Sequence, residues 1–408
     1  SAVSNVATTG VITIPLMKRG GYTDEDAGGI EAVASTGGQL TPPIMGAAAF
    51  LMAEFLEIPY VTVAGAALIP AVLYYLGVFL QVDLIAQRDG IRNAEAERLN
   101  TRQVLADGWH FLLPFAILLF ALFGLRMDPE DSALLASVAV IAAGFLRGYR
   151  GEKLTLAGFG EVFVNTGRSM VDLILVVAAA GFVIGVLNVT GLGFALTLLL
   201  VDSVGSSIVL LLAISAVICI ILGMGMPTSG VYVLLAALVA PSLVEAGVQP
   251  IAAHLFILYF GMMSMITPPV ALAAFAAAAI TGAGALATGV AAMRIGWAAF
   301  ILPFAFVATP ALLLEGSLTA SLFAAGLTAI GIAAVTSGIV GYWGGRLNGA
   351  MRLVAITLGF LTLPLGFLGL PDAIHAVAGV ATAALGVALI FFTSNSADAP
   401  LGQGRRAD

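Results

Sequence analysis

The sequence predicts an all-α polytopic membrane protein, and its composition and hydropathy pattern are the observations that predict it. Of the 408 residues, 60% are hydrophobic and 10% are charged, and the mean hydropathy is +1.08. Uncharged runs of about 18–25 residues recur along the chain, and each is long enough to cross a bilayer as a helix. A membrane β-barrel would instead alternate polar and apolar residues, and this sequence does not.

The charged residues divide the chain into spans and give it an orientation. All 16 Lys and Arg residues fall on expected loops or helix ends. Nearly every basic residue lies on one side, and nearly every loop with acidic residues alone lies on the other. Because basic loops remain in the cytoplasm, the C-terminus is expected there. The ten predicted spans are residues 28–53, 59–86, 109–125, 132–147, 168–188, 250–281, 295–315, 317–341, 352–370 and 373–393.

The spans group into five segments, two of which form a repeat. Residues 90–106 mix charged and apolar side chains, which predicts a helix lying on the membrane surface. A solvated cytoplasmic linker is the alternative interpretation. The predicted segments are 1–58 (first repeat of a transport domain), 59–167 (scaffold spans), 168–294 (second repeat, with a hairpin at 206–246 and a broken helix at 250–281), 295–393 (C-terminal spans) and 394–408 (cytoplasmic tail).

An internal repeat relates the two halves of the chain. The tripeptide Thr-Pro-Pro occurs at 41–43 and again at 267–269, at an offset of 226 residues. The same offset pairs Gly21 with Gly247, and each tripeptide follows a stretch of small polar residues. Chance similarity between Ala-rich segments is the alternative. The ordered matches favour a true repeat.

The small polar stretches predict hairpin tips inside the membrane. They read SNVATTG at 4–10 and GMGMPTSG at 223–230. The arms on either side of the second stretch are residues 206–222 and 231–246. Each is about 16 residues, or roughly 24 Å as helix, which is short for a membrane crossing. A re-entrant hairpin is therefore expected there.

Residues 11–17 would be the second arm of a matching first hairpin. Its first arm would precede Ser1, so the chain is expected to be part of a longer protein. The first broken helix is expected to run outward and the second inward. The repeat is then inverted, which is typical of secondary transporters.

The breaks and the tips are expected to favour ions of opposite charge. The prolines remove backbone donors and disfavour helix in the preceding Thr. Carbonyls one turn upstream are then expected to be freed, and together with hydroxyls they suit a small cation. The helices after the tips present their N-termini, which favour anions, at Thr9, Gly10, Ser229 and Gly230. The expected free carbonyls are those of Gly37, Gly38, Met263 and Ser264. The alternative is that the prolines only kink the helices and the tips only pack closely.

The sequence has few residues suited to proton coupling, metal binding or phosphate binding, which limits the functions that it can have. No Asp or Glu falls within either tip or either break, whereas a proton-coupled carrier usually needs a buried titrating group. Three scattered His and one Cys predict no transition-metal site, and no phosphate-binding loop occurs. The sequence therefore predicts a Na⁺-coupled symporter of an anionic solute, with no organic cofactor and no enzymatic activity.

Several motifs in combination resemble the large membrane subunit of TRAP transporters, the tripartite ATP-independent periplasmic family. The resemblance covers about residues 1–315, and the additional spans at 317–393 are similar to the TAXI-type branch. The motifs are SAVSNVATTGV, STGGQLTPPIMGAAAFLMAE, NVTGLG at 188–193, GMGMPTSGVYVL and GMMSMITPPVALAAFAAA.

The resemblance implies an elevator mechanism, in which a mobile domain slides against a static scaffold. It also implies Na⁺ coupling, the inner membrane of a bacterial or archaeal cell, and a periplasmic solute-binding protein that delivers a carboxylate. A small membrane subunit, fused upstream or separate, and the lipid bilayer are further expected partners; nucleic acid is not. By motif, the first Na⁺ site would use Ser4, Asn5, Gly38, Thr41 and Met45, and the second Gly223, Gly225, Thr228, Met263 and Thr267. The helix breaks would be Pro42, Pro43, Pro268 and Pro269.

Two other functions remain open from the sequence. One is a Na⁺/dicarboxylate symporter that works without a binding protein, since that family also has Ser-Asn-Thr tips and inverted hairpins. The other is a non-transporting membrane assembly subunit, which would have no solute cavity and no response to Na⁺.

Overall fold

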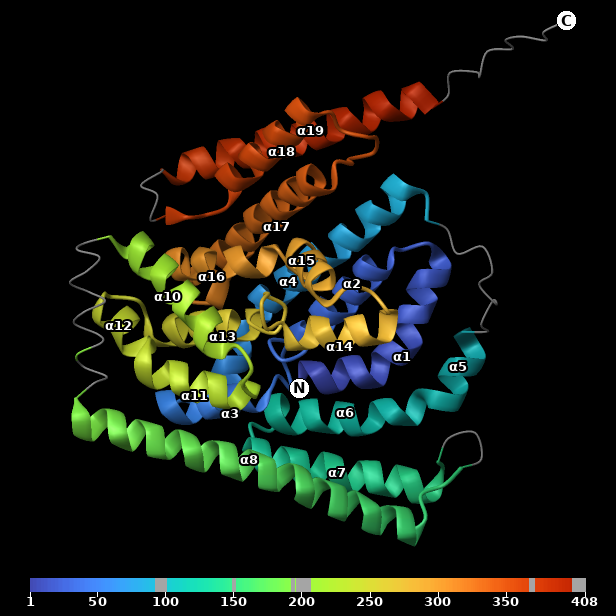
Figure 1. Cartoon of the computed structure of the whole chain (residues 1–408), viewed down its shortest axis with the longest axis vertical. Helices are drawn as coiled ribbons and strands as arrows, with labels where there is room; N and C mark the ends of the chain where they lie inside the picture. Colours follow the sequence, from blue (N-terminus) through green and yellow to red (C-terminus); the bar gives the residue numbers. More distant parts are fainter. Residues whose placement is uncertain (92–100, 149–151, 192–194, 196–206, 367–370, 398–408) are drawn as a thin grey trace, which may run out of the picture.

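The computed structural model describes residues 1–91, 101–148, 152–191, 195, 207–366 and 371–397. Within them the regular elements are helices, so the prediction of an all-α protein is confirmed (Figure 1). Several of these helices are long and apolar enough to cross a membrane. By length and composition they are Tyr60–Asp89, Ala106–Gly124, Pro129–Leu146, Ala285–Ala308 and Leu318–Val340.

Two sets of shorter helices correspond to the predicted repeats. The first set is α1 (Ala2–Gly20), α2 (Asp24–Gly37) and α3 (Ala47–Leu56). The second is α10 (Ile208–Gly223), α11 (Thr228–Leu238), α12 (Ala240–Glu245), α13 (Pro250–Met263) and α14 (Leu272–Thr281). The two breaks separate α2 from α3 and α13 from α14, as predicted.

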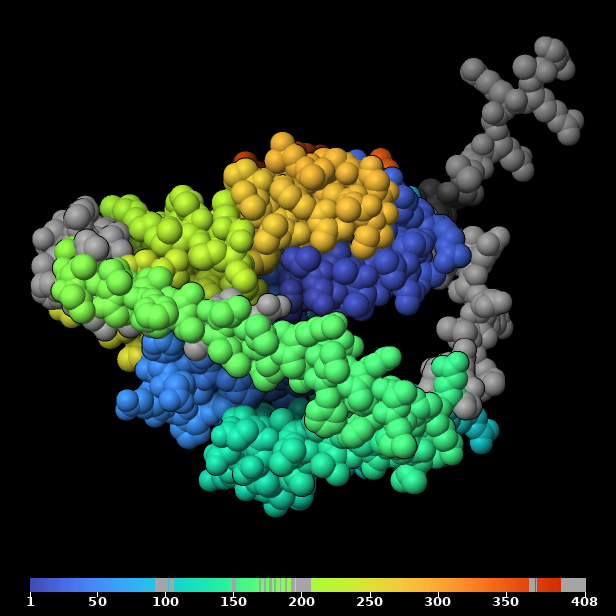
Figure 2. All heavy atoms as spheres, turned by 60° about the horizontal axis from the view of Figure 1, so that its bottom comes forward, coloured from blue at the N-terminus to red at the C-terminus, as the bar shows by residue number. Residues whose placement is uncertain are grey.

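In each set, one helix packs both against a helix of its own set and against a helix of the other set. Helix α1 packs against α2 of its own set and α14 of the other set, while α11 packs against α13 of its own set and α3 of the other. Figure 2 shows α1 and α14 side by side on one face of the molecule. Such an arrangement is what two copies of one unit produce when a two-fold axis relates them.

The ends of the matching arms are also built alike. After α1, the Gly21 N–H donates to the Lys18 carbonyl, and Gly21 has φ +113°. After α12, at an offset of 226, the Gly247 N–H donates to the Val244 carbonyl and Gly247 has φ +92°. Both positions lie in the left-handed region, which glycine adopts without steric cost. The sequence repeat is therefore a repeat of local structure.

The predicted spans 250–281 and 295–315 leave residues 282–294 between them as a loop that ends at Arg294, and this prediction is wrong. Residues Ala285–Ile295 form helix α15, which packs tightly on α2. A Cβ atom on Gly29 would lie 3.0 Å from the Ala292 nitrogen, and one on Gly28 would lie 2.8 Å from a Thr288 methyl. The small residues let the backbones of α2 and α15 approach closely, so α15 supports α2 by direct packing.

The remaining helices surround the unit formed by α1–α3 and α10–α15. Helix α4 packs against α2, α3, α16 and α17, and α8 packs against α11. They are α4 (Tyr60–Asp89), α5 (Thr101–Gly108), η1 (Trp109–Phe111), α6 (Leu112–Leu119), η2 (Phe120–Gly124), α7 (Pro129–Leu146), α8 (Leu156–Thr190), α16 (Ala298–Ala308), η3 (Pro310–Leu313), α17 (Leu318–Val340), α18 (Gly349–Thr362) and α19 (Asp372–Ala397).

Some predicted boundaries differ from the structure. The span expected at 168–188 begins earlier, since α8 starts at Leu156 behind a Thr155 side-chain cap. Residues 92–100 of the expected surface helix and 398–408 of the expected tail lie outside the described residues. The NVTGLG motif is described only as far as Gly191.

Basic residues gather at one end of the unit, as the topology argument requires. Lys18 bridges Asp24 at 3.0 Å and donates to the Thr281 carbonyl, and Arg294 pairs with Asp26. Beside them in the turn between α1 and α2, burial raises the pKa of the Tyr22 hydroxyl.

Candidate ion and solute site

The tip of the second hairpin lies where the sequence predicted it. Helix α10 ends at Gly223 and α11 begins at Thr228, with the residues between them outside both helices. Gly225 has φ +78°, a conformation that side chains with a Cβ rarely adopt. The first-turn amides of α11, which include those of Ser229 and Gly230, are therefore at a helix N-terminus, as expected.

The SNVATTG stretch is not a helix-breaking tip, and that prediction is wrong. Helix α1 runs without interruption from Ala2, and the Ser1 side chain accepts a hydrogen bond from the Ser4 amide. The Thr8 and Thr9 hydroxyls donate to carbonyls one turn back in the same helix, at 3.0 and 2.8 Å. Small polar residues can satisfy themselves in this way inside a helix. Thr9 and Gly10 therefore lie inside helix α1 and not at a helix N-terminus.

The two Thr-Pro-Pro breaks make the same hydrogen bonds. Thr41 donates its hydroxyl to the Gly37 carbonyl and Thr267 donates to the Met263 carbonyl, both at 2.7 Å. These carbonyls also accept backbone N–H groups from Leu40 (3.0 Å) and Ile266 (3.1 Å) respectively. In both breaks, the peptide bond between the prolines is cis.

These bonds correct which carbonyls the breaks leave free. Gly37 and Met263 were expected to have free carbonyls, but each accepts two hydrogen bonds. One residue later, the carbonyls of Gly38 and Ser264 accept none from the described residues. Each lies four residues before a proline, Pro42 or Pro268, which has no N–H to donate. Of the four expected carbonyls, the structure therefore frees two.

The residues predicted for the second Na⁺ site lie close together. A Cβ atom on Gly223 would lie 2.8 Å from the Ser264 hydroxyl and 3.1 Å from the Gly261 carbonyl, so the hairpin tip sits directly on the second break. Ser264 is 1% exposed and Thr267 is 9% exposed. The pair of elements thus encloses a hydroxyl and a free carbonyl, the hard oxygen ligands that Na⁺ prefers.

The residues predicted for the first Na⁺ site come from α1 and the first break. Asn5 is tied close to that break, since its amide donates to the Ser35 hydroxyl at 2.9 Å. Met45 has φ +52° and its N–H donates to the Thr41 carbonyl. Gly38 is exposed, so this break is more open than the second.

A cavity of about 260 Å³ lies where the hairpin tip meets the start of α1. Pockets for drug-sized ligands are about 300–1,000 Å³, so this cavity suits a small solute. Thr228 lines it and also belongs to the predicted second Na⁺ site. Thr9 and Gly10, predicted to face the solute, lie two turns further along α1. The cavity is lined by Ser1, Ala2, Val3, Gly225, Met226, Pro227, Thr228, Met265 and Leu272.

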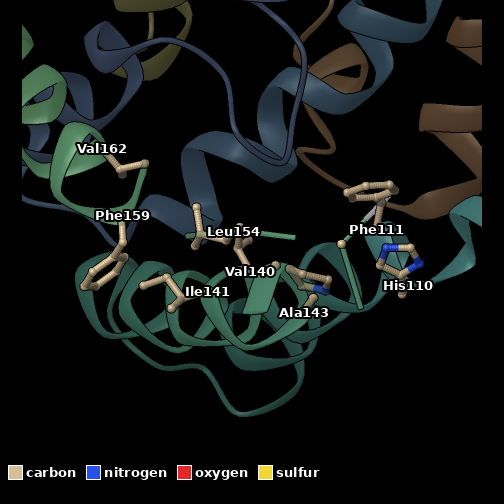
Figure 3. A pocket seen from close by; sticks show the side chains of 11 residues that line it. His110, Phe111, Val140, Ile141, Ala143, Leu154, Phe159 and Val162 are labelled. Carbon is tan, nitrogen blue, oxygen red and sulfur yellow. The ribbon is translucent and has the colours of Figure 1, made fainter. Parts of the chain in front are cut away.

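A second cavity, of about 280 Å³, lies among α6, α7 and α8. Figure 3 shows Val140, Ile141 and Phe159 lining it, with His110 at one side. Among the residues that the structure describes, the lining has no Lys or Arg and the His110 ring nitrogens have no hydrogen-bond partner. The described lining of the hairpin-tip cavity also has no Lys or Arg, but it includes Thr228 of the predicted second Na⁺ site, which makes that cavity the candidate solute site.

One buried acid escaped the sequence analysis. Glu31, in the middle of α2, is 6% exposed and accepts hydrogen bonds from Thr9 and Thr13 of α1, at 2.5 Å each. The available signal was a lone Glu within the predicted apolar span 28–53. No acid lies in either tip or either break, but the Glu31 carboxylate does contact the SNVATTG stretch.

Comparison with known proteins decides the family. The family model described as "Tripartite ATP-independent periplasmic transporter, DctM component" matches residues 1–321. The chain belongs to this family. It is also 26% identical over 313 residues to the C4-dicarboxylate TRAP transporter large permease protein DctM of Pseudomonas aeruginosa, a match that covers 76% of this chain and 71% of the relative.

Membership identifies the chain as a TRAP large permease subunit, a transporter component and not an enzyme. It implies a periplasmic binding protein and a small membrane subunit as partners. The matched region ends within α17, so α18 and α19 lie beyond it.

Proposed function

We propose that this TRAP permease drives uptake of a C4-dicarboxylate or a similar organic anion with Na⁺, by an elevator movement of its two repeats. The observation that carries the proposal is the meeting of the second hairpin tip with the second break. There, Gly223 at the end of α10 lies against buried Ser264, whose carbonyl accepts no hydrogen bond from the described residues, and Thr228 at the start of α11 lines a small cavity. Cation and anion chemistry therefore adjoin one another.

The cation ligands follow from the hydrogen bonds. In the second site they are the Ser264 carbonyl, the Thr267 hydroxyl oxygen and tip groups from Gly223, Gly225 and Thr228. Thr267 donates its only proton to Met263, which leaves its oxygen lone pairs for a cation. The matching first-site ligands are the Gly38 carbonyl and the Thr41 hydroxyl, with Ser4, Asn5 and Met45 nearby.

The substrate class rests on two supports. The Pseudomonas aeruginosa relative is named for C4-dicarboxylate. The amides at the start of α11 offer N–H donors and a positive dipole end to a carboxylate. The packing of α1–α3 with α10–α15 gives one candidate mobile unit, which α8 joins through its packing on α11, and α4 with α16–α19 gives a candidate scaffold.

The test is uptake of radiolabelled succinate by the full-length permease with its small subunit in liposomes. We expect uptake to require both an inward Na⁺ gradient and the solute-binding protein. Uptake at full rate without the binding protein would instead support the binding-protein-independent symporter. Uptake that needs no Na⁺ would refute Na⁺ coupling, and a membrane assembly subunit would show no uptake in any arm.

A further inference from the structure

A buried carboxyl group lies between the two repeats. It forms no hydrogen bond with the cation ligands described above, although one of them, Asn5, is linked to it through Ser35. Glu31 of α2 lies against α1 and α14. A Cβ atom on Gly10 would lie 3.3 Å from the Glu31 Cγ and 3.2 Å from the Ile280 Cδ1, so the glycine allows α1 to approach both side chains closely. The carboxyl group is therefore enclosed by three helices of the candidate mobile unit.

Hydroxyl groups surround this carboxyl. Thr9 contacts Oε1 and Thr13 contacts Oε2, both at 2.5 Å, and Ser35 lies 3.4 Å from Oε1. Asn5 in turn donates to the Ser35 hydroxyl. The cluster is polar and hydrogen-bonded throughout, although it lies in a chain that is 60% hydrophobic.

The cluster has fewer hydroxyl hydrogens than hydrogen-bond acceptors, so it can take up one more proton. The Thr9 hydroxyl also lies 2.8 Å from the Asn5 carbonyl, and the Thr13 hydroxyl lies 3.0 Å from the Thr9 carbonyl. Each hydroxyl has a single hydrogen for these two acceptors. A protonated Glu31 can donate to one Thr oxygen while that Thr donates to its own carbonyl. Both protonation states therefore fit the same heavy-atom positions.

No positive charge neutralises the carboxylate. Among the described residues Glu31 forms no salt bridge, because Lys18 of α1 pairs with Asp24, and Arg294 of α15 pairs with Asp26. Arg19 of α1 is exposed and donates to the Pro15 carbonyl. The other groups that face α2 are the Tyr74 and Tyr75 hydroxyls of α4, which donate to backbone carbonyls, and α14 has no ionisable side chain.

An unpaired charge at such a place is costly, and neutralisation by a proton removes the cost. The geometry favours a proton over a metal ion. Hard cations sit between oxygen ligands at about 2.0–2.6 Å from each one. Here the carboxylate and hydroxyl oxygens are themselves 2.5 Å apart, which is the separation of a short O–H···O hydrogen bond.

We propose that Glu31 is a proton-binding site of the permease, which loads and unloads through the Thr9 hydroxyl. Thr9 is exposed whereas Glu31 is buried, so the hydroxyl links the carboxyl to the surface. In the loaded state the carboxylate has gained one proton and is neutral; on unloading it returns that proton to water. This inference rests on the proposed transport function and adds a proton to its Na⁺.

The first test is direct and needs no solute. Acid-minus-alkaline infrared difference spectra of the purified full-length permease report protonated carboxyl groups. We expect Glu31→Gln to lose one carboxyl band, while the matched control Glu25→Gln, in the first turn of the same helix, retains it. An unchanged spectrum in Glu31→Gln overturns the proposal, and this result does not depend on the transported solute.

The second test measures coupling in liposomes with succinate, the binding protein, fixed Na⁺ and a clamped membrane voltage. An inside-alkaline gradient should stimulate wild-type uptake severalfold, and Glu31→Gln should lose the stimulation while retaining Na⁺-dependent exchange. Stimulation that survives in Glu31→Gln overturns the proposal. A tenfold shift in Na⁺ requirement with unchanged stimulation also overturns it, in favour of a Na⁺ site. Absence of Na⁺ dependence in the wild type would count against the proposed Na⁺ coupling alone.

A second variant leaves the acid in place in case Glu31→Gln fails to fold. Thr9→Val removes the hydroxyl that reaches the surface. Thr8→Val is the control, because the hydrogen bonds of the Thr8 hydroxyl within the described part of the chain go to carbonyls of its own helix. We expect a severalfold loss of stimulation in Thr9→Val and none in Thr8→Val. Equal stimulation in both variants overturns the route through Thr9.

Discussion

Removing the Thr267 hydroxyl tests whether the second break is a cation site. The Thr267→Val change keeps the side-chain shape but deletes one oxygen. That oxygen is in a residue only 9% exposed, and its hydrogen bond goes to the Met263 carbonyl at 2.7 Å. Loss of a partner in a buried polar site costs about 1–3 kcal/mol. At 1.4 kcal/mol per tenfold, the Na⁺ concentration for half-maximal uptake should rise roughly fivefold to a hundredfold.

A matched control separates ion binding from stability. Thr328 in α17 is fully buried, and its hydroxyl donates to the Ala324 carbonyl at the same 2.7 Å. Thr328→Val therefore removes the same kind of hydrogen bond, worth about 0.5–1.5 kcal/mol, far along the chain from the break. We expect both variants to lower the melting temperature, and Thr267→Val alone to change the Na⁺ requirement.

The assay is the Na⁺ dependence of succinate uptake in liposomes, with melting temperatures measured on the same preparations. If the two variants have the same Na⁺ requirement as the wild type, then the Thr-Pro-Pro sequence only shapes the helix. The reasoning from hydroxyl lone pairs to cation binding would then be refuted.

Three further variants probe the same region. Pro268→Ala restores an N–H that can bond the Ser264 carbonyl; it should raise the Na⁺ requirement severalfold in the uptake assay, and an unchanged requirement would contradict a role for that carbonyl. Gly223→Ala places a Cβ 2.8 Å from the Ser264 hydroxyl and should reduce uptake severalfold, whereas Gly326→Ala meets open space in α17 and should retain the wild-type rate. Met226→Asp puts a carboxylate in the cavity and should raise the KM for succinate tenfold or more, while Met226→Leu leaves it nearly unchanged; equal KM values would place the solute elsewhere.

The parts of the fold that the sequence predicted are those fixed by local backbone chemistry. Pro268 cannot donate an N–H, and Gly225 adopts a positive φ, so breaks and tips are visible in the residues themselves. Because the repeat relates the two halves by a fixed offset, a break predicted in one half could be located in the other. The second hairpin and both broken helices were found in this way.

Most of the misses arose where tertiary contacts decide. SNVATTG is the exception, because its Thr hydroxyls donate to carbonyls of their own helix, which is a local effect. Helix α15 forms where a loop was expected because Gly28 and Gly29 of α2 offer it a flat surface. The role of Glu31 depends on Thr9 and Thr13, which lie 22 and 18 residues earlier in the chain. No local pattern shows which residues will meet across such distances.

The hairpin tip also suggests how ion and solute are coupled. Thr228 belongs to the proposed second Na⁺ site and lines the candidate solute cavity, so in this proposal the two charges would bind on either side of one residue. Opposite unit charges about 5 Å apart attract by about 3 kcal/mol at an effective dielectric constant near 20. Such a coupling energy corresponds to roughly a hundredfold mutual increase in affinity, and it must be reciprocal. Saturating Na⁺ should therefore tighten succinate binding to the purified permease by the same factor by which saturating succinate tightens Na⁺ binding. Calorimetric titrations that give equal succinate affinities with and without Na⁺ would show that the two sites do not share this tip.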